Sequence, residues 1–129
     1  MRLPPWIGTL LIVLGAALVA LATLWPIPSE SHSEPAWCIV CDEDDIPNFV
    51  LNIVLFLPLG AGLRYRGVAP PAALVLLAGL TCGVEAAQFR LVPGRDASLG
   101  DVIANLLGGL AGFALAGRLP ETVRGAKAE

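Results

Sequence analysis

The chain is poor in charged residues, and this shortage limits what it can be. Asp, Glu, Lys and Arg make up only 15% of its 129 residues, whereas hydrophobic residues make up 56% and the mean hydropathy is +0.74. This composition is too apolar for a soluble domain of this size, so a lipid bilayer is the expected solvent. The net charge of -3 gives no indication of a nucleic-acid partner.

Reactive side chains are also scarce. The single histidine, His32, lies outside every long apolar segment, and no serine or cysteine stands beside a basic partner in the pattern of a nucleophilic site. The spacing of metal ligands is absent as well. We therefore expect no cofactor and no metal, and an enzyme is the less favoured class.

Four segments come close to the length of about 20 apolar residues that a membrane-spanning helix needs. The first runs without a charge between Trp6 and Trp25 and stops at a Pro-Ile-Pro sequence, which cannot continue a helix. The last follows Ser98-Leu99-Gly100-Asp101, which resembles a capping box. We predict an all-α, single-domain protein over residues 1–129, with a bundle of four transmembrane helices. Their expected positions are about 6–25, 48–63, 70–89 and 100–117.

A second interpretation of the N-terminus is a cleaved signal peptide over residues 2–22. Arg2 gives it a weakly basic start, and Ala20-Leu21-Ala22 resembles a small-residue cleavage site. The apolar run is longer than that of a typical signal peptide, which favours a spanning helix. The remaining three helices keep the same orientation in either case.

The basic residues predict the orientation of the bundle, because cytoplasmic loops retain Lys and Arg. A cytoplasmic N-terminus places both termini inside and leaves only Arg90 and Arg95 outside. The inner side then holds Arg2, Arg64, Arg66, Arg118, Arg124 and Lys127. The connection over residues 26–47 becomes an acidic outer loop without a basic residue. Its acids are Glu30, Glu34, Asp42, Glu43, Asp44 and Asp45.

Polar residues recur near the outer ends of the second, third and fourth helices. They form the pairs Asn48 and Asn52, Glu85 and Gln88, and Asp101 and Asn105. Spacings of three and four residues place each pair on one face of its helix. Carboxylates that face lipid are costly, so Glu85 and Asp101 should face inward, with Arg95 as their cationic partner. The predicted ligand-binding set is Asn52, Glu85, Gln88, Arg95, Asp101 and Asn105. The alternative is that these residues only provide hydrogen bonds between helices.

Small residues indicate where helices pack closely. Gly79 and Gly83 form a G-x-x-x-G motif in the third helix, and Gly108 and Gly112 form another in the fourth. We expect these two helices to approach each other through these glycines, which are also candidate surfaces for a homo- or hetero-oligomer.

The cysteines support no catalytic site. Cys38 and Cys41 lack the βαβ context of a thioredoxin-like motif, and Asp42, not histidine, follows them, which excludes a haem attachment. In the outer loop they could form a disulfide or, with His32 and an acid, bind a metal, and the disulfide is preferred. Cys82 is expected to be a small buried residue of the third helix.

Four ordered motifs resemble the VanZ-like family. They are Asn52-Ile-Val-Leu-Phe56-Leu-Pro58-Leu59-Gly60, Glu85-Ala-Ala-Gln88, Arg95, and Asp101-Val-Ile-Ala-Asn105-Leu-Leu-Gly108. The resemblance covers roughly residues 48–112. Two features depart from it, since Asn48 stands where an acid is common and the acidic Cys-containing loop is not part of the pattern.

The resemblance implies an integral protein of the bacterial cytoplasmic membrane, in a group named for a teicoplanin-resistance accessory protein. We expect an envelope accessory factor whose outer-leaflet polar pocket binds a lipid head group or an amphiphile, such as a lipid-linked cell-wall precursor. One alternative is an intramembrane enzyme acting on a lipid-linked substrate, with Glu85 as the general base. The other is a structural assembly subunit.

Overall fold

The computed structural model describes residues 4–24, 37, 39–40, 45–92 and 98–118, and these residues contain four long helices and no strand. They are α1 (Pro5–Leu24), α2 (Asp45–Tyr65), α3 (Pro70–Leu91) and α4 (Leu99–Arg118). Each is long and apolar enough to cross a membrane. The predicted all-α bundle of four transmembrane helices is confirmed, and α2 begins three residues earlier than expected, at Asp45.

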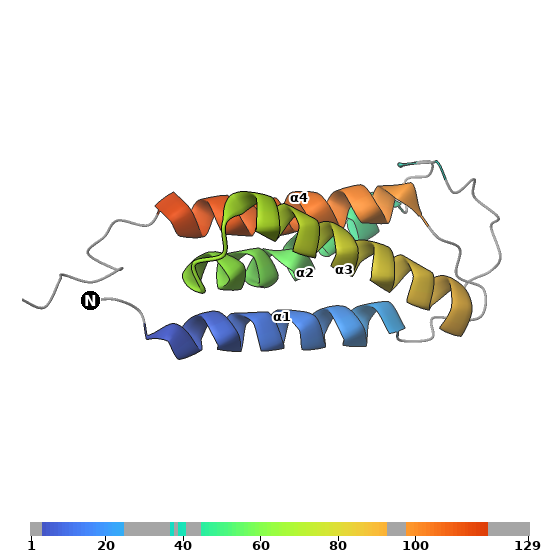
Figure 1. Ribbon diagram of the computed structural model, residues 1–129. Helices are drawn as coiled ribbons and strands as arrows, with labels where there is room; N and C mark the ends of the chain where they lie inside the picture. Colours follow the sequence, from blue (N-terminus) through green and yellow to red (C-terminus); the bar gives the residue numbers. More distant parts are fainter. Residues whose placement is uncertain (1–3, 25–36, 38, 41–44, 93–97, 119–129) are drawn as a thin grey trace, which may run out of the picture.

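The helices alternate in direction, so that α1 and α3 end where α2 and α4 begin (Figure 1). This end of the bundle is called the polar end below. The parallel helices α2 and α4 form the most extensive contact, and α1 packs mainly on α2. Helix α3 lies obliquely, beginning near α4 and ending at the level of the end of α1 (Figure 1).

The apolar core is small and centres on α2. Phe56 and Leu59 of α2 pack with Val19 of α1 and Leu77 of α3, and all four are buried. Most other large apolar side chains are exposed on the outside of the bundle, as in α1, where Leu10, Val13, Leu14, Leu18 and Leu21 all face outward. Such an apolar surface is suited to contact with the hydrocarbon core of a membrane.

Glycines bring the backbones of α2 and α4 into direct contact. A Cβ atom at Gly60 would overlap the carbonyl of Gly109 on α4. In the same way, a Cβ at Gly108 or Gly112 would overlap the carbonyls of Ile53 and Leu57 on α2. Only residues without a side chain allow this approach, which is how helices commonly associate in membranes.

The predicted glycine contact between the third and fourth helices is wrong. Gly108 and Gly112 face α2, and a Cβ at Gly79 or Gly83 would meet no atom within 4 Å. The glycine of α4 that approaches α3 is Gly109, against the side chain of Leu77. A G-x-x-x-G motif marks a face that allows close approach, but it does not specify which helix occupies that face.

Cys82 also differs from expectation, because it is exposed on α3. It follows Thr81, which is fully buried, and successive helical residues point about 100° apart around the axis. Cys82 therefore shares the outward side of α3 with Gly79 and Gly83.

Candidate functional site at the polar end

One face of α3 changes from apolar to polar along its length. Its buried residues are Ala73, Leu77, Thr81, Glu85 and Gln88, spaced by three or four positions. This spacing forms a single stripe along the helix. The first two side chains join the apolar half of the bundle, and the last three bring hydrogen-bonding groups into its polar end.

Asn52 and Asp101 join α2 to α4. The Asn52 side chain is buried, and its Nδ2 donates a hydrogen bond of 2.6 Å to Asp101 Oδ1. Asp101 lies in the first turn of α4 and is partly buried. A carboxylate is also favourable there because the amino end of a helix carries a partial positive charge.

Glu85 joins α3 to the start of α4. The residue is only 6% exposed, and its Oε2 accepts a 2.9 Å hydrogen bond from the backbone N of Ser98. Ser98 precedes α4, and its hydroxyl accepts a 3.4 Å hydrogen bond from the backbone N of Asp101. The serine of the predicted capping box thus caps the fourth helix, while the backbone N of Ser98 donates to Glu85. These contacts connect Glu85, Ser98, Asp101 and Asn52 into one network, called the polar network below.

Asn105 and Thr81 form a second contact between α4 and α3, one turn deeper than the polar network. Asn105 Nδ2 donates a 2.9 Å hydrogen bond to Thr81 Oγ1. Asn105 is 1% exposed and Thr81 is fully buried. Among the described residues, Asn105 Oδ1 has no hydrogen-bond partner. This pair therefore depends on a single hydrogen bond in an apolar surrounding.

Replacing Thr81 with valine should destabilise the protein by about 1–3 kcal/mol, because it removes the acceptor of the Asn105 hydrogen bond while keeping the side-chain shape. The double variant Thr81→Val with Asn105→Leu should recover most of this loss, since it removes both polar groups together. Unfolding midpoints in detergent measure both effects. A double variant that is no more stable than Thr81→Val alone would contradict this prediction. It would show that the pair contributes more to stability than its own hydrogen bond.

Gln88 belongs to a different interface. Its Nε2 donates a 3.1 Å hydrogen bond to the backbone carbonyl of Thr23 on α1. The Thr23 hydroxyl in turn donates to the carbonyl of Val19, one turn earlier in the same helix. Gln88 thus ties the end of α3 to the end of α1, and none of these bonds connects it to the polar network.

The five predicted site residues that the structure describes lie toward one end of the bundle. Asn52, Glu85, Gln88 and Asn105 are buried and Asp101 is partly buried, and each of the two carboxylates accepts a hydrogen bond from a residue outside its own helix. Asn48, by contrast, is exposed. Arg95 lies outside the described residues, and so do His32 and the proposed disulfide partners Cys38 and Cys41.

Three residues outside the predicted set take part in the contacts at this end, namely Thr23, Thr81 and Ser98. Thr81 could have been predicted from the sequence, because it lies four residues before Glu85 and therefore on the same helical face. The contribution of Thr23 could not be recognised, because Gln88 binds its backbone carbonyl and any residue carries that group.

The side chains that meet here are carboxylates, amides and hydroxyls. Within the described ranges, no three His, Cys, Asp or Glu residues are placed to hold a metal ion together. The chemistry that these groups offer is the donation and acceptance of hydrogen bonds and the binding of positive charge.

A family model described as VanZ/LLP1 matches residues 7–119 of the chain. This match includes α2, α3 and α4, all of α1 except its first two residues, and every residue of the polar network. Comparison with curated proteins and with solved structures finds no match.

Proposed function

The chain belongs to the VanZ/LLP1 family, and we propose that it is an envelope accessory protein whose polar end binds the head group of a membrane lipid or amphiphile. The observation that carries this proposal is the polar network, which joins α2, α3 and α4 through two carboxyl groups, an amide and a helix cap. It occupies one end of a bundle whose four helices are each apolar enough to cross a membrane.

Stabilisation of helix packing alone does not explain why the polar network is present. An aspartate at the centre of a membrane helix costs about 2.5 to 3.5 kcal/mol on the insertion scale, whereas a hydrogen bond between membrane helices contributes only about 0.6 kcal/mol on average. Acidic residues in such helices commonly mark binding sites or pathways. Glu85 is the one acidic residue that is buried in the described part of the chain, and it is the strongest sign of such a site.

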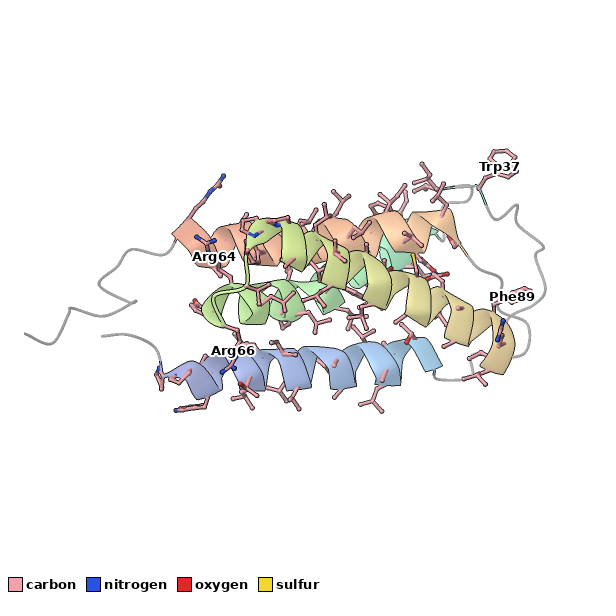
Figure 2. All side chains as sticks on the ribbon, in the orientation of Figure 1. Trp37, Arg64, Arg66 and Phe89 are labelled. Carbon is pink, nitrogen blue, oxygen red and sulfur yellow. The ribbon has the colours of Figure 1, made fainter. Side chains whose placement is uncertain are left out.

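The proposed orientation places the polar end in the outer leaflet. Arg64 and Arg66 lie at the opposite end of the bundle from Phe89 (Figure 2), and six of the eight basic residues fall on that side when both termini are cytoplasmic. An outward-facing polar end is where head groups of the outer leaflet and lipid-linked cell-wall precursors of a bacterial cytoplasmic membrane would be met.

In this proposal Arg95 contacts an anionic phosphate, and Asn52 offers hydrogen bonds to the rest of the head group. Glu85 and Asp101 hold the surrounding groups in position. The link to glycopeptides follows from the same site, since its occupancy would alter the access of a lipoglycopeptide such as teicoplanin to membrane-anchored precursors.

Phosphatidylglycerol added to the protein in detergent should raise the unfolding temperature of the wild type. Arg95→Ala and Glu85→Gln should remove this increase while leaving insertion and expression intact, because one variant loses the proposed cation and the other loses the carboxylate proposed to hold it in position. Asn48→Ala is the matched control, since Asn48 is exposed near the same end of α2. An equal increase in all four proteins would contradict the proposal.

A second candidate is a structural subunit of a larger assembly, and one observation favours it. Gly79 and Gly83 form an open G-x-x-x-G face on the outside of α3, where no atom of the described chain fills the space. Gly108 and Gly112 are already occupied by α2, so an oligomer would use the α3 face. The oligomeric state of the purified protein separates this candidate from a monomer that carries bound lipid.

A further inference from the structure

A short apolar segment interrupts the acidic connection between α1 and α2. Residues 35–41 carry no charge, although Glu34 precedes them and four acidic residues follow from Asp42 onward. Three positions of this segment are described, and all three side chains are exposed. Trp37 is 75% exposed, and Ile39 and Val40 are each nearly half exposed.

The backbone of this segment rests on the beginning of α4. A Cβ atom at Gly100 would overlap the carbonyl oxygen of Ile39, so these two backbones are in direct contact. Gly100 lies in the first turn of α4, between Ser98 and Asp101 of the polar network. The segment is therefore fixed beside the point where a membrane-spanning helix begins.

Trp37 extends away from the bundle beside this end of α4, and Phe89 is exposed at the same end of the molecule (Figure 2). Tryptophan and other aromatic side chains concentrate where hydrocarbon meets head groups, because their rings are apolar while the indole N–H still finds a polar partner. An exposed tryptophan at this end of the bundle therefore suits the region between hydrocarbon and head groups.

We propose that Trp37, Ile39 and Val40 insert into the interface of the phospholipid bilayer beside α4. The occupant of this exposed apolar surface is the lipid itself, because the segment is held against a spanning helix at the depth where the helix enters the membrane. The acidic residues on both sides of it in the sequence favour water, which limits the proposed insertion to these apolar side chains. This anchoring does not depend on whether the polar network binds a ligand.

The fluorescence of Trp37 tests the proposal in the full-length protein. The variant Trp6→Phe with Trp25→Phe leaves Trp37 as the only tryptophan. In vesicles of phosphatidylcholine and phosphatidylglycerol with brominated acyl chains, its emission should be blue-shifted from that of aqueous tryptophan. It should also be strongly quenched by the brominated lipid and little affected by iodide in the buffer. If the double substitution prevents folding, the difference between wild type and Trp37→Phe supplies the same signal.

A tryptophan placed at Phe89, in a chain that lacks the three native tryptophans, gives the reference for an interfacial position at this end of the bundle. Quenching of Trp37 comparable to that reference supports the proposal. Emission at the aqueous position, quenched by iodide and unaffected by brominated lipid, would overturn it and would leave the segment as a surface for a partner outside the membrane.

Discussion

Replacing Gly60 with alanine is expected to destabilise the protein by about 3 kcal/mol or more, the upper end of the usual cost of overpacking. The added Cβ would occupy the position of the Gly109 carbonyl, and it would also approach the backbone N of Phe113. Both neighbours are backbone atoms of α4, so no side-chain rotation relieves the overlap and the two helices must separate. The concentration of SDS that unfolds the protein, compared with wild type, measures this cost.

Gly79→Ala and Gly83→Ala are the matched controls for Gly60→Ala. All three positions are glycines inside spanning helices, but a Cβ at either α3 position meets no atom within 4 Å. The stability of both controls should lie within about 1 kcal/mol of wild type, the range of the difference in helix propensity between alanine and glycine. A Gly60→Ala protein as stable as these controls would show that α2 and α4 do not touch at this point.

Replacing Asp101 with leucine is expected to cost about 1–3 kcal/mol, because Asn52 loses the acceptor of its 2.6 Å hydrogen bond while its amide stays buried. The double variant Asn52→Leu with Asp101→Leu should regain much of that stability, since an apolar pair leaves no buried amide behind. Under the proposed function, the double variant should be stable and yet fail to respond to lipid.

Asn48→Leu is the control, because it makes the same asparagine-to-leucine change as Asn52→Leu at an exposed position. Asn48 is an exposed asparagine one turn before Asn52 on the same helix, so its replacement should alter neither stability nor the lipid response. A double variant at Asn52 and Asp101 that keeps the full lipid response would show that the polar network serves only to hold the helices together.

The spanning segments could be predicted from sequence because the requirement is simple. A helix that crosses the bilayer needs enough consecutive apolar residues, and α1, with no charge between Trp6 and Trp25, meets it directly. The early start of α2 was missed because Asp45 looked like part of the acidic loop. An acidic residue is favourable in a first helical turn, so the helix can begin there.

The partners of the helices could not be predicted from their motifs. Gly79 and Gly83 have the same spacing as Gly108 and Gly112, yet only the second pair lies at a helix contact. The difference arises from the complementary surface, which α2 supplies through Gly60 and through the carbonyls of Ile53 and Leu57. Which two helix faces pack together depends on both faces, so the motif of one helix does not predict its partner.

The polar residues show a similar limit. Helical spacing placed Asp101 and Asn105 correctly on one inward side of α4. The same spacing failed for Asn48 and Asn52, of which only Asn52 is buried. Residues four apart differ by about 40° around the helix axis, and neighbours are fewer at the end of a helix. Asn48 therefore remains exposed although it shares the motif.

The most direct test of the polar end as a lipid site is mass spectrometry of the intact protein with the lipids that co-purify with it. We expect the wild type and Asn48→Leu to retain a phospholipid through gentle removal of detergent. The stable double variant Asn52→Leu with Asp101→Leu should lose that lipid. The same lipid retained equally by all three proteins, or by none of them, would contradict the account.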